Sequence, residues 1–247
     1  MGQRVQQQLQ KEHQVTIIAQ SEDAKQGEFD VIIDFSHPNN LEGIIRYVEK
    51  NPIPLVIATT GYTPSQLVKI EKLALKVPVL FSANFSLGVT LMNRVVQDMS
   101  RVLADAFDIE VIEKHHHLKV DAPSGTAKML VDSLNQTLNY QVVHGREGMA
   151  KRTKKEIGVH TIRGGSIVGE HEVLFAGADE LISIKHEALS KSIFATGAIR
   201  GAQWLLTQAK GLYQMEDVLF PQERTAASRY QIDDLVAKGE SGSASHA

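Results

Sequence analysis

Cysteine is absent from the 247 residues of the sequence. Its absence excludes disulfides, thiolate nucleophiles, and zinc or iron–sulfur sites built on cysteine. Long apolar runs are absent as well, because no segment approaches the roughly 18 uninterrupted apolar residues that a bilayer span requires. The N-terminus also lacks an apolar stretch of signal-peptide length. We therefore expect a cytoplasmic protein with no membrane partner.

The sequence also has no surplus of positive charge. Lys and Arg number 26 against 29 Asp and Glu, for a formal net charge of −3. Proteins that bind nucleic acid through bulk charge show a basic surplus, so we expect no nucleic-acid partner, although a small basic pocket is compatible with this balance. Hydrophobic residues make up 43%, enough for a core in one large domain or two modest ones. The small, polar residues 238–247 predict a disordered tail.

The first half of the chain alternates two periodicities. Short apolar runs rich in β-branched residues predict strands covered on both faces, at Val15–Ala19, Val31–Phe35, Leu55–Thr59 and Val77–Phe81. Between them, residues 41–48 and 67–74 carry apolar side chains at helical spacing, and Thr63-Pro64-Ser65-Gln66 is typical of a helix start. Strand–helix alternation with short loops predicts an α/β fold with a doubly wound parallel sheet.

After Asn84 the pattern changes. We expect a long helix over 88–106 with Leu91, Val95, Val102 and Leu103 on its apolar stripe, a strand over 109–112 and a helix over 124–139. Three strand-like segments separated by glycine-containing turns follow Gly158 and predict an antiparallel meander. A final helix is expected over 193–208, with Trp204 in the core. The second lobe is therefore predicted to be α+β with a mostly antiparallel or mixed sheet.

Three predicted strands end in small polar residues. These ends are Asp34–Pro38, Ala58-Thr59-Thr60-Gly61 and Ser82-Ala83-Asn84-Phe85-Ser86. Ligands of open α/β sheets bind beyond the carboxyl ends of the strands, and small hydroxyl or amide residues let a ligand approach the backbone. Such residues also serve as ordinary caps and turns. Their recurrence on successive strands favours a nucleotide or cofactor site.

Residues 113–126, EKHHHLKVDAPSGT, form the densest chemical cluster. His115 and Lys119 share a side both in an extended chain and in a helical turn, and histidine is suited to proton transfer near neutral pH. Ser124-Gly125-Thr126 opens a helix whose free N–H groups favour a carboxylate or phosphate. The alternatives are a solvated surface strand and a metal site. We expect no metal, because only His115 and His117 could share an ion.

Other polar residues give weaker signals. His171 and His186 lie in the predicted meander strands and are expected to be structural. Arg163-Gly164-Gly165 is compatible with a tight turn or with a loop whose arginine meets an anion.

The chain resembles the dihydrodipicolinate reductase (4-hydroxy-tetrahydrodipicolinate reductase) family of the bacterial diaminopimelate and lysine pathway. The resemblance extends to about Phe220 and rests on DFSHP, ATTGY, SANFSLG, EKHHHLKVDAPSGTA, HTIRGG-SIVGEHEVLFAG and GLYQMEDVL. It implies a Rossmann-type dinucleotide-binding domain (1–86 and 193–237) and a substrate-binding and oligomerisation domain (87–192). It further implies NADH or NADPH as cofactor, a small dicarboxylate as substrate and a homotetramer.

The resemblance also implies roles for single residues. His115 matches the family's proton donor and acceptor, and Lys119 matches a second proton donor. Substrate contacts fall on His116, Ser124, Gly125 and Thr126. Cofactor contacts fall on Ala58, Thr59, Thr60, Ser82, Ala83, Asn84 and Phe85. Ala58 stands where the family has glycine, and its backbone contact is expected to survive.

The family opens with a strand and a glycine-rich phosphate loop that ends in Met-Gly, and this sequence starts at Met1-Gly2. The resemblance thus places roughly ten family residues, with a central strand and the pyrophosphate turn, before this point. A catalytically impaired binding or regulatory paralogue is the alternative that this start suggests. Cofactor choice depends on the residue after the second strand, and the absence of a basic residue in 19–22 favours NADH or dual use.

Overall fold

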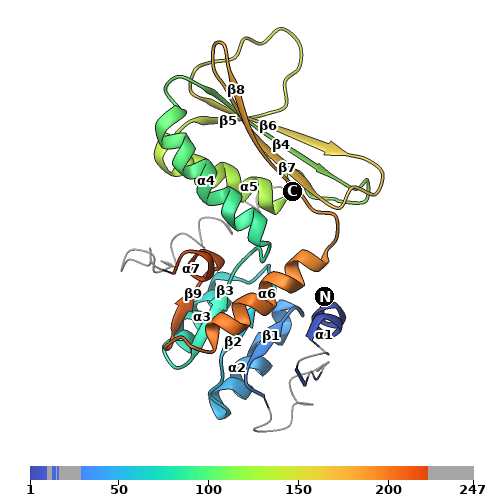
Figure 1. Ribbon diagram of the computed structural model, residues 1–247, viewed down its shortest axis with the longest axis vertical. Helices are drawn as coiled ribbons and strands as arrows, with labels where there is room; N and C mark the ends of the chain where they lie inside the picture. Colours follow the sequence, from blue (N-terminus) through green and yellow to red (C-terminus); the bar gives the residue numbers. More distant parts are fainter. Residues whose placement is uncertain (10–12, 15, 17–28, 222–247) are drawn as a thin grey trace. The chain divides into compact units, whose positions relative to one another are not determined.

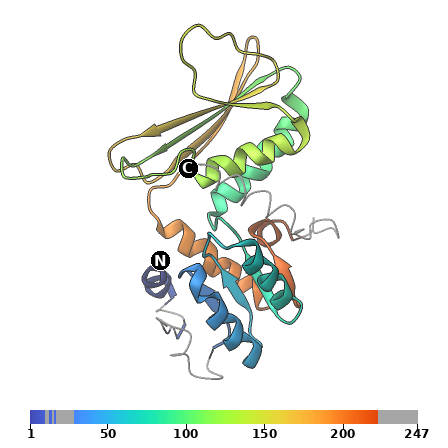
Figure 2. The ribbon, with the colours of Figure 1, turned by 180° about the vertical axis from the view of Figure 1, so that it is seen from behind.

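The computed structural model describes residues 1–9, 13, 14, 16 and 29–221 of the chain (Figures 1 and 2). The chain divides into two compact units. One unit contains residues 1–87 together with the chain from Ser192 onward, and the other contains Gly88–Lys191. Within the described residues, no helix combines the length and the apolar character needed to cross a membrane.

Within its described residues, the first unit is built on a four-stranded parallel sheet with the order β1-β2-β3-β9. Its strands are β1 (Ile32–Asp34), β2 (Leu55–Ile57), β3 (Pro78–Phe81) and β9 (Gly211–Tyr213). Its helices are α1 (Gly2–Leu9), the short 3-10 helix η2 (Pro38–Asn40), α2 (Leu41–Lys50), α3 (Pro64–Ala74), α6 (Ser192–Leu205) and α7 (Met215–Leu219).

Helices cover both faces of this sheet (Figures 1 and 2). Successive side chains of a strand point to opposite faces, so Leu55 and Ile57 pack with α2 and α3, whereas Val56 packs with α6. All three side chains are at most 1% exposed. This two-sided burial explains the uninterrupted apolar runs in the sequence. The predicted doubly wound α/β fold is confirmed.

Most local predictions for this unit hold. Thr63 caps α3 through a capping box, in which Thr63 Oγ1 accepts from the Gln66 N–H and Gln66 Oε1 accepts from the Thr63 N–H. Trp204 packs edge-on against Tyr213 in the core. The predicted strand over 15–19, residues 19–22 and the predicted tail lie outside the described residues. Strand β9 was not predicted, because three residues that include a glycine carry no periodic signal.

The second unit is a five-stranded mixed sheet with the order β5-β6-β4-β7-β8, covered on one face by two helices (Figure 1). The elements are α4 (Leu87–Leu103), β4 (Asp108–His115), α5 (Gly125–Leu138), β5 (Gln141–His144), β6 (Glu156–Arg163), β7 (Glu170–Ala176) and β8 (Leu181–Glu187). Val111, Leu130 and Phe175 are fully buried between sheet and helices. The predicted mixed sheet is confirmed.

The predicted antiparallel meander is wrong in its first step. β7 and β8 form an antiparallel pair, but β6 pairs in parallel with β4 and β5, so β4 lies between β6 and β7. The local pattern of a strand identifies the strand but not its neighbours, which are chosen by tertiary packing.

The predicted apolar stripe of α4 is wrong in part, although its member Leu103 does pack against the core of this unit. Leu91 is 50% exposed and Val102 is 80% exposed, whereas Met92 and Val96 are buried. Apolar residues occur at adjacent positions along this helix, so helical spacing alone allowed two neighbouring stripes. Packing against the sheet selects the stripe that contains Met92 and Val96.

Candidate active site

The first group of predicted site residues lies at one edge of the parallel sheet. Asp34 pairs with Ile57 and Ile57 pairs with Phe81, so β1, β2 and β3 end side by side. The Ala58 N–H continues the pairing by donating to the Asp34 carbonyl over 2.8 Å. The segments that follow the three strands therefore leave the sheet at the same edge, where open α/β sheets bind their ligands.

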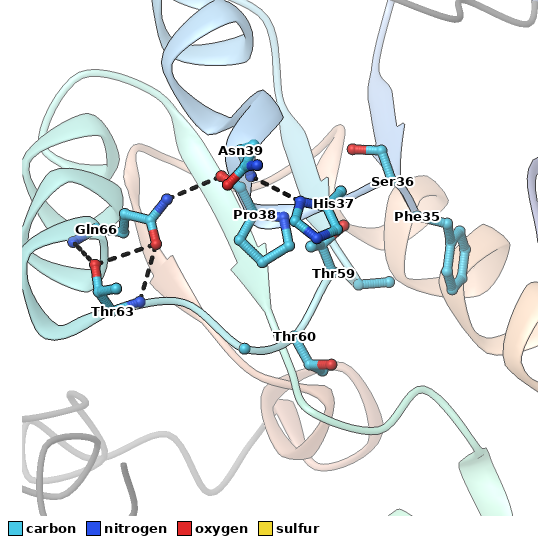
Figure 3. Close-up of a pocket in the computed structure, with 11 residues that line it drawn as sticks. Phe35, Ser36, His37, Pro38, Asn39, Thr59, Thr60, Thr63 and Gln66 are labelled. Carbon is cyan, nitrogen blue, oxygen red and sulfur yellow. Dashed lines mark hydrogen bonds between the residues drawn. The ribbon is translucent and has the colours of Figure 1, made fainter. Parts of the chain in front are cut away.

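A cavity of about 480 Å³ opens between the first two of these segments (Figure 3). Its lining consists of Phe35, Ser36, His37, Pro38, Asn39, Ala58, Thr59, Thr60, Gly61, Thr63 and Gln66. Gln66 Nε2 donates to the Pro38 carbonyl over 2.9 Å and thereby ties the start of α3 to the loop after β1. The predicted cofactor residues Ala58, Thr59 and Thr60 thus line a cavity of ligand size.

Asp34, the first residue of the predicted polar strand end Asp34–Pro38, holds the loop after β1. Its buried Oδ1 accepts from the Ser36 N–H at 2.9 Å and from Ser36 Oγ at 2.5 Å, and its Oδ2 accepts from the Tyr62 hydroxyl at 3.3 Å. Burial, and then the Asp34 carboxylate, raise the pKa of Tyr62, which keeps this phenol neutral. The Asp34 contacts fix two walls of the cavity.

The predicted segment Ser82–Phe85 follows β3 but does not line the cavity. Ser82 Oγ donates to the Asn84 carbonyl over 2.9 Å, and Asn84 Oδ1 accepts from the Ser86 N–H over 2.8 Å, so the segment is a tightly bonded turn. Helix α6 passes directly beside it: a Cβ on Gly197 would lie 1.6 Å from the Phe85 carbonyl oxygen. Only glycine allows this approach.

The edge fits part of a dinucleotide. The cavity lies within the usual size of cofactor sites, and hydroxyl and amide groups outnumber apolar side chains in its wall. Gly61 has φ +83°, a conformation that favours glycine, in the part of the lining that leads from β2 to α3. The residues after β1 and β2 would hold the nucleotide, and Ser82–Phe85 completes the same edge.

The second group of predicted residues lies in the other unit, around a buried carboxylate that the sequence did not predict. Glu113, on β4, has no exposed surface. Its Oε2 pairs with His115 Nδ1 at 2.5 Å and accepts from the Arg163 guanidinium at 2.9 Å. Its Oε1 accepts from Arg163 at 2.8 Å and from the Ser124 N–H at 3.0 Å. We call Glu113, His115, Ser124, Arg163 and His171 the Glu113 cluster.

These contacts determine the charge of Glu113. Burial by itself raises the pKa of its carboxyl, but hydrogen bonds from Arg163, His115 and the Ser124 backbone outweigh burial and hold the pKa below its ordinary value. Glu113 is therefore ionised at neutral pH. The sequence allowed either a tight turn at residues 163–165 or an arginine that meets an anion. The structure has both features: Gly165 adopts a positive φ in the turn, and Arg163 forms an ion pair with the internal carboxylate of Glu113.

His115 ends β4 and is 9% exposed. Burial lowers the pKa of its imidazole, Glu113 opposes this shift, and the charges of Lys119 and Arg163 reinforce it. On its other side the ring faces Gly169, where a Cβ would lie 3.1 Å from Nε2. The missing side chain leaves room at this nitrogen.

Ser124 and His171 connect this carboxylate to helix α5. Ser124 Oγ accepts from the Ala127 N–H at 3.2 Å as the N-cap and lies 2.9 Å from His171 Nε2. Ser124 Oγ and His171 Nε2 therefore share a hydrogen bond whose direction depends on the tautomer of His171. The His171 imidazole is neutral because burial, and then the neighbouring His115, lower its pKa to about 4. His171 was expected to be structural, and its contact with Ser124 places it inside the cluster.

The residues between His115 and Ser124 follow neither predicted conformation. β4 ends at His115 and the chain turns, so that His117 packs against the Gly165 carbonyl, 2.9 Å from Nδ1, and the Lys119 N–H donates to the His116 carbonyl. Lys119 Nζ pairs with the exposed Asp121 carboxylate at 2.7 Å. Lys119 remains near enough to His115 for its charge to lower the pKa of the ring.

The predicted anion site is the start of α5. Gly125 is exposed, and a side chain there would meet nothing within 4 Å, whereas Ser124 is only 2% exposed and already bonded. A ligand carboxylate would therefore meet the backbone at Gly125 and Thr126 rather than the Ser124 hydroxyl.

Two sequence-family models cover this chain. The model described as "Dihydrodipicolinate reductase, N-terminus" matches residues 1–85, and the model described as "Dihydrodipicolinate reductase, C-terminus" matches residues 88–219. The chain belongs to the dihydrodipicolinate reductase family. This membership confirms the resemblance that the sequence motifs indicated.

Individual dihydrodipicolinate reductase relatives agree. The 4-hydroxy-tetrahydrodipicolinate reductase of Clostridium novyi is 49% identical over 192 residues, which cover 77% of this chain and 76% of that protein. The protein of the same name from Brachyspira hyodysenteriae is 46% identical over 213 residues, or 85% and 92% of the two chains. A dipicolinate-bound dihydrodipicolinate reductase from Paenisporosarcina sp. TG-14 has a TM-score of 0.62 at 24% identity, over 75% and 71% of the chains, and shares the fold.

Proposed function

We propose that this protein reduces 4-hydroxy-tetrahydrodipicolinate to tetrahydrodipicolinate with NADH or NADPH, in diaminopimelate and lysine biosynthesis. The observation that carries the proposal is that residues of the family's motif lie together in the structure. His115 is fixed by a buried ionised carboxylate, Lys119 is near it, and an accessible helix start follows. Family membership over residues 1–219 supports the same reaction.

The division of labour follows from the contacts. When bound at the edge of the parallel sheet, the nicotinamide supplies a hydride. Lys119 and the N–H groups of Gly125 and Thr126 would hold the carboxylates of the cyclic substrate through charge-assisted hydrogen bonds. His116 would add a contact beside them. His115 would move the accompanying proton at Nε2, with Lys119 as the second proton donor. The hydride and one proton together replace the 4-hydroxyl of the substrate, which leaves as water.

The test is His115→Gln. A positioned proton donor contributes about 10²–10⁴ in rate, so turnover should fall within that range. Binding of NADH and NADPH, followed by fluorescence titration, should stay close to wild type, because His115 lies in the other unit from the cofactor residues. His144→Gln, at an exposed position in the same unit as His115, is the control. Unchanged turnover in His115→Gln would remove this residue from the proposed role.

The same titration decides between an enzyme and a paralogue without catalysis. Saturable binding of either nucleotide together with turnover of the substrate supports the reductase. Failure to bind both nucleotides would favour the binding or regulatory paralogue. The ratio of the two affinities gives the cofactor preference, for which NADH or dual use is our proposal.

We further propose a cytoplasmic homotetramer. Within the described part of the second unit, helices cover one face of the five-stranded sheet, and the other face carries apolar side chains, including Ile162 at 44% and Leu181 at 69% exposure. Uncovered apolar patches of this kind are typical of subunit interfaces. Light scattering after gel filtration should give four times the chain mass. Leu181→Lys should shift the protein to smaller species.

A further inference from the structure

We infer, on the basis of the proposed reductase function, that Glu113 is a positioning residue. It fixes His115 as the tautomer that carries its proton on Nδ1, and it ties this imidazole to the anion-binding start of helix α5. Arg163 is its obligatory partner. Neither Glu113 nor Arg163 touches the substrate in this account, and both act through His115 and Ser124.

The hydrogen bonds of Glu113 determine the tautomer. An ionised carboxylate can only accept, so the contact of 2.5 Å with His115 Nδ1 requires the hydrogen to lie on Nδ1. The lone pair of the neutral ring is then on Nε2, which lies beside Gly169, where a Cβ would be only 3.1 Å away. Nε2 becomes the atom that takes up and releases the proton.

Arg163 makes the buried charge of Glu113 tolerable. A carboxylate with no exposed surface would otherwise take up a proton. The guanidinium binds both carboxylate oxygens and also donates to the Ile162 and Asp121 carbonyls, so its own position is fixed. Such bidentate pairs combine charge with planar geometry, which a lysine does not reproduce.

The remaining lone pairs of Glu113 connect the imidazole to α5. Glu113 Oε1, the oxygen that does not contact His115, accepts from the Ser124 N–H, one residue before the helix begins. One side chain therefore sets the distance from His115 to the N–H groups of Gly125 and Thr126. For a ring substrate held by a carboxylate, this distance determines whether the proton reaches the reacting carbon.

The charged and titratable groups that face His115 come from four segments. Glu113 approaches from β4, Arg163 from β6, His171 from β7, and Lys119 from the turn after β4. Only Glu113 favours the protonated ring, and the cations oppose it. Loss of the Glu113 charge should therefore make His115 harder to protonate.

The first measurement needs no variant and no activity. Nitrogen-15 shifts of the His115 ring in the full-length wild-type protein at neutral pH should show a protonated Nδ1 and an unprotonated Nε2. The opposite tautomer would overturn the proposal. This result stands whether or not the protein reduces the proposed substrate, so the two proposals can fail separately.

The second measurement uses Glu113→Gln. The Oε1 position faces two donors, Arg163 and the Ser124 N–H, so the oxygen of the glutamine amide should stay there. The amide nitrogen then takes the Oε2 position and donates to His115 Nδ1, so the tautomer should invert. The titration of His115 followed by NMR should move down by about one pH unit or more. Turnover should fall by a factor of about 10² or more, with KM for the nucleotide unchanged. Glu113→Asp, which keeps the charge, should restore the Nδ1 tautomer and part of the turnover.

The matched control is Glu156→Gln. Glu156 is another buried glutamate of the same sheet, bound to Arg146 at 2.9 Å, and lies outside the Glu113 cluster. The Glu156→Gln protein should be less stable than wild type, but the tautomer and the titration of its His115 should be unchanged. If Glu113→Gln behaves like this control, Glu113 is merely structural and the proposal is wrong. If Glu113→Gln does not fold, the wild-type tautomer and Arg163→Lys, with the same readouts, decide.

Discussion

Burial of His171 should make the protein sensitive to mild acid. The side chain is 5% exposed, and burial followed by the neighbouring His115 lowers its pKa from 6.5 to about 4. In the unfolded chain the same imidazole has its ordinary pKa of 6.5. The unfolded state therefore binds more protons than the folded state between these two pKa values, and stability falls as the pH is lowered through this window.

The two pKa values give the magnitude. At pH 7 both states are mostly neutral and the effect is small. At pH 5 the unfolded imidazole is almost fully protonated while His171 in the folded protein is not, which lowers the free energy of unfolding by about 2 kcal/mol. Below pH 4 the loss levels off, because both states then carry the proton.

Urea denaturation at pH 7 and pH 5 measures this loss. His171→Gln removes the titrating group and keeps a side chain that can share a hydrogen bond with Ser124. The difference in the free energy of unfolding between the two pH values should therefore shrink by about 2 kcal/mol. His144→Gln removes an exposed histidine of the same unit and should leave the difference unchanged. An equal pH dependence in wild type and His171→Gln would refute the assignment of a buried neutral imidazole.

Two glycine substitutions test the packing around each group of site residues. In Gly197→Ala the new Cβ would lie 1.6 Å from the Phe85 carbonyl oxygen, so we expect a loss of about 1–3 kcal/mol in urea denaturation and weaker nucleotide binding by fluorescence. Gly125→Ala, where the Cβ meets nothing within 4 Å, is its stability control. In Gly169→Ala the Cβ would lie 3.1 Å from His115 Nε2, so turnover should fall about tenfold while nucleotide affinity is retained. If this variant turned over as fast as the wild type, the His115 ring would have room to move.

The parts of the fold that could be predicted are those encoded locally. The apolar runs of β1, β2 and β3 and the Thr63 capping box depend on a few neighbouring residues, so sequence patterns suffice. Strand order in the mixed sheet depends on contacts between residues far apart in the chain, as the 50 residues between Glu113 and Arg163 illustrate. The hydrophobic periodicity of a segment does not indicate which distant strand it pairs with, and the predicted antiparallel meander was wrong for this reason.

The site shows the same division. His115, Lys119 and the start of α5 could be predicted as site residues because they lie close together in one continuous segment of the sequence. Glu113 belongs to that segment too. A glutamate on a strand is expected to be exposed, however, unless it is known which face of the sheet is covered by helices. Its alternation with the buried Val111 and His115 was the one available signal, since these three residues share a face of β4.

The charges around His115 also indicate which cation can bind a substrate. The chain is slightly acidic overall, and the Glu113–Arg163 and Lys119–Asp121 pairs are both neutral as pairs. Arg163 cannot leave Glu113, because an unpaired carboxylate without solvent contact is costly. Asp121 has a side chain that is 55% exposed, so water can replace Lys119 as its partner. We therefore propose Lys119 as the cation that exchanges its carboxylate for one of the substrate, while Arg163 keeps the imidazole in place.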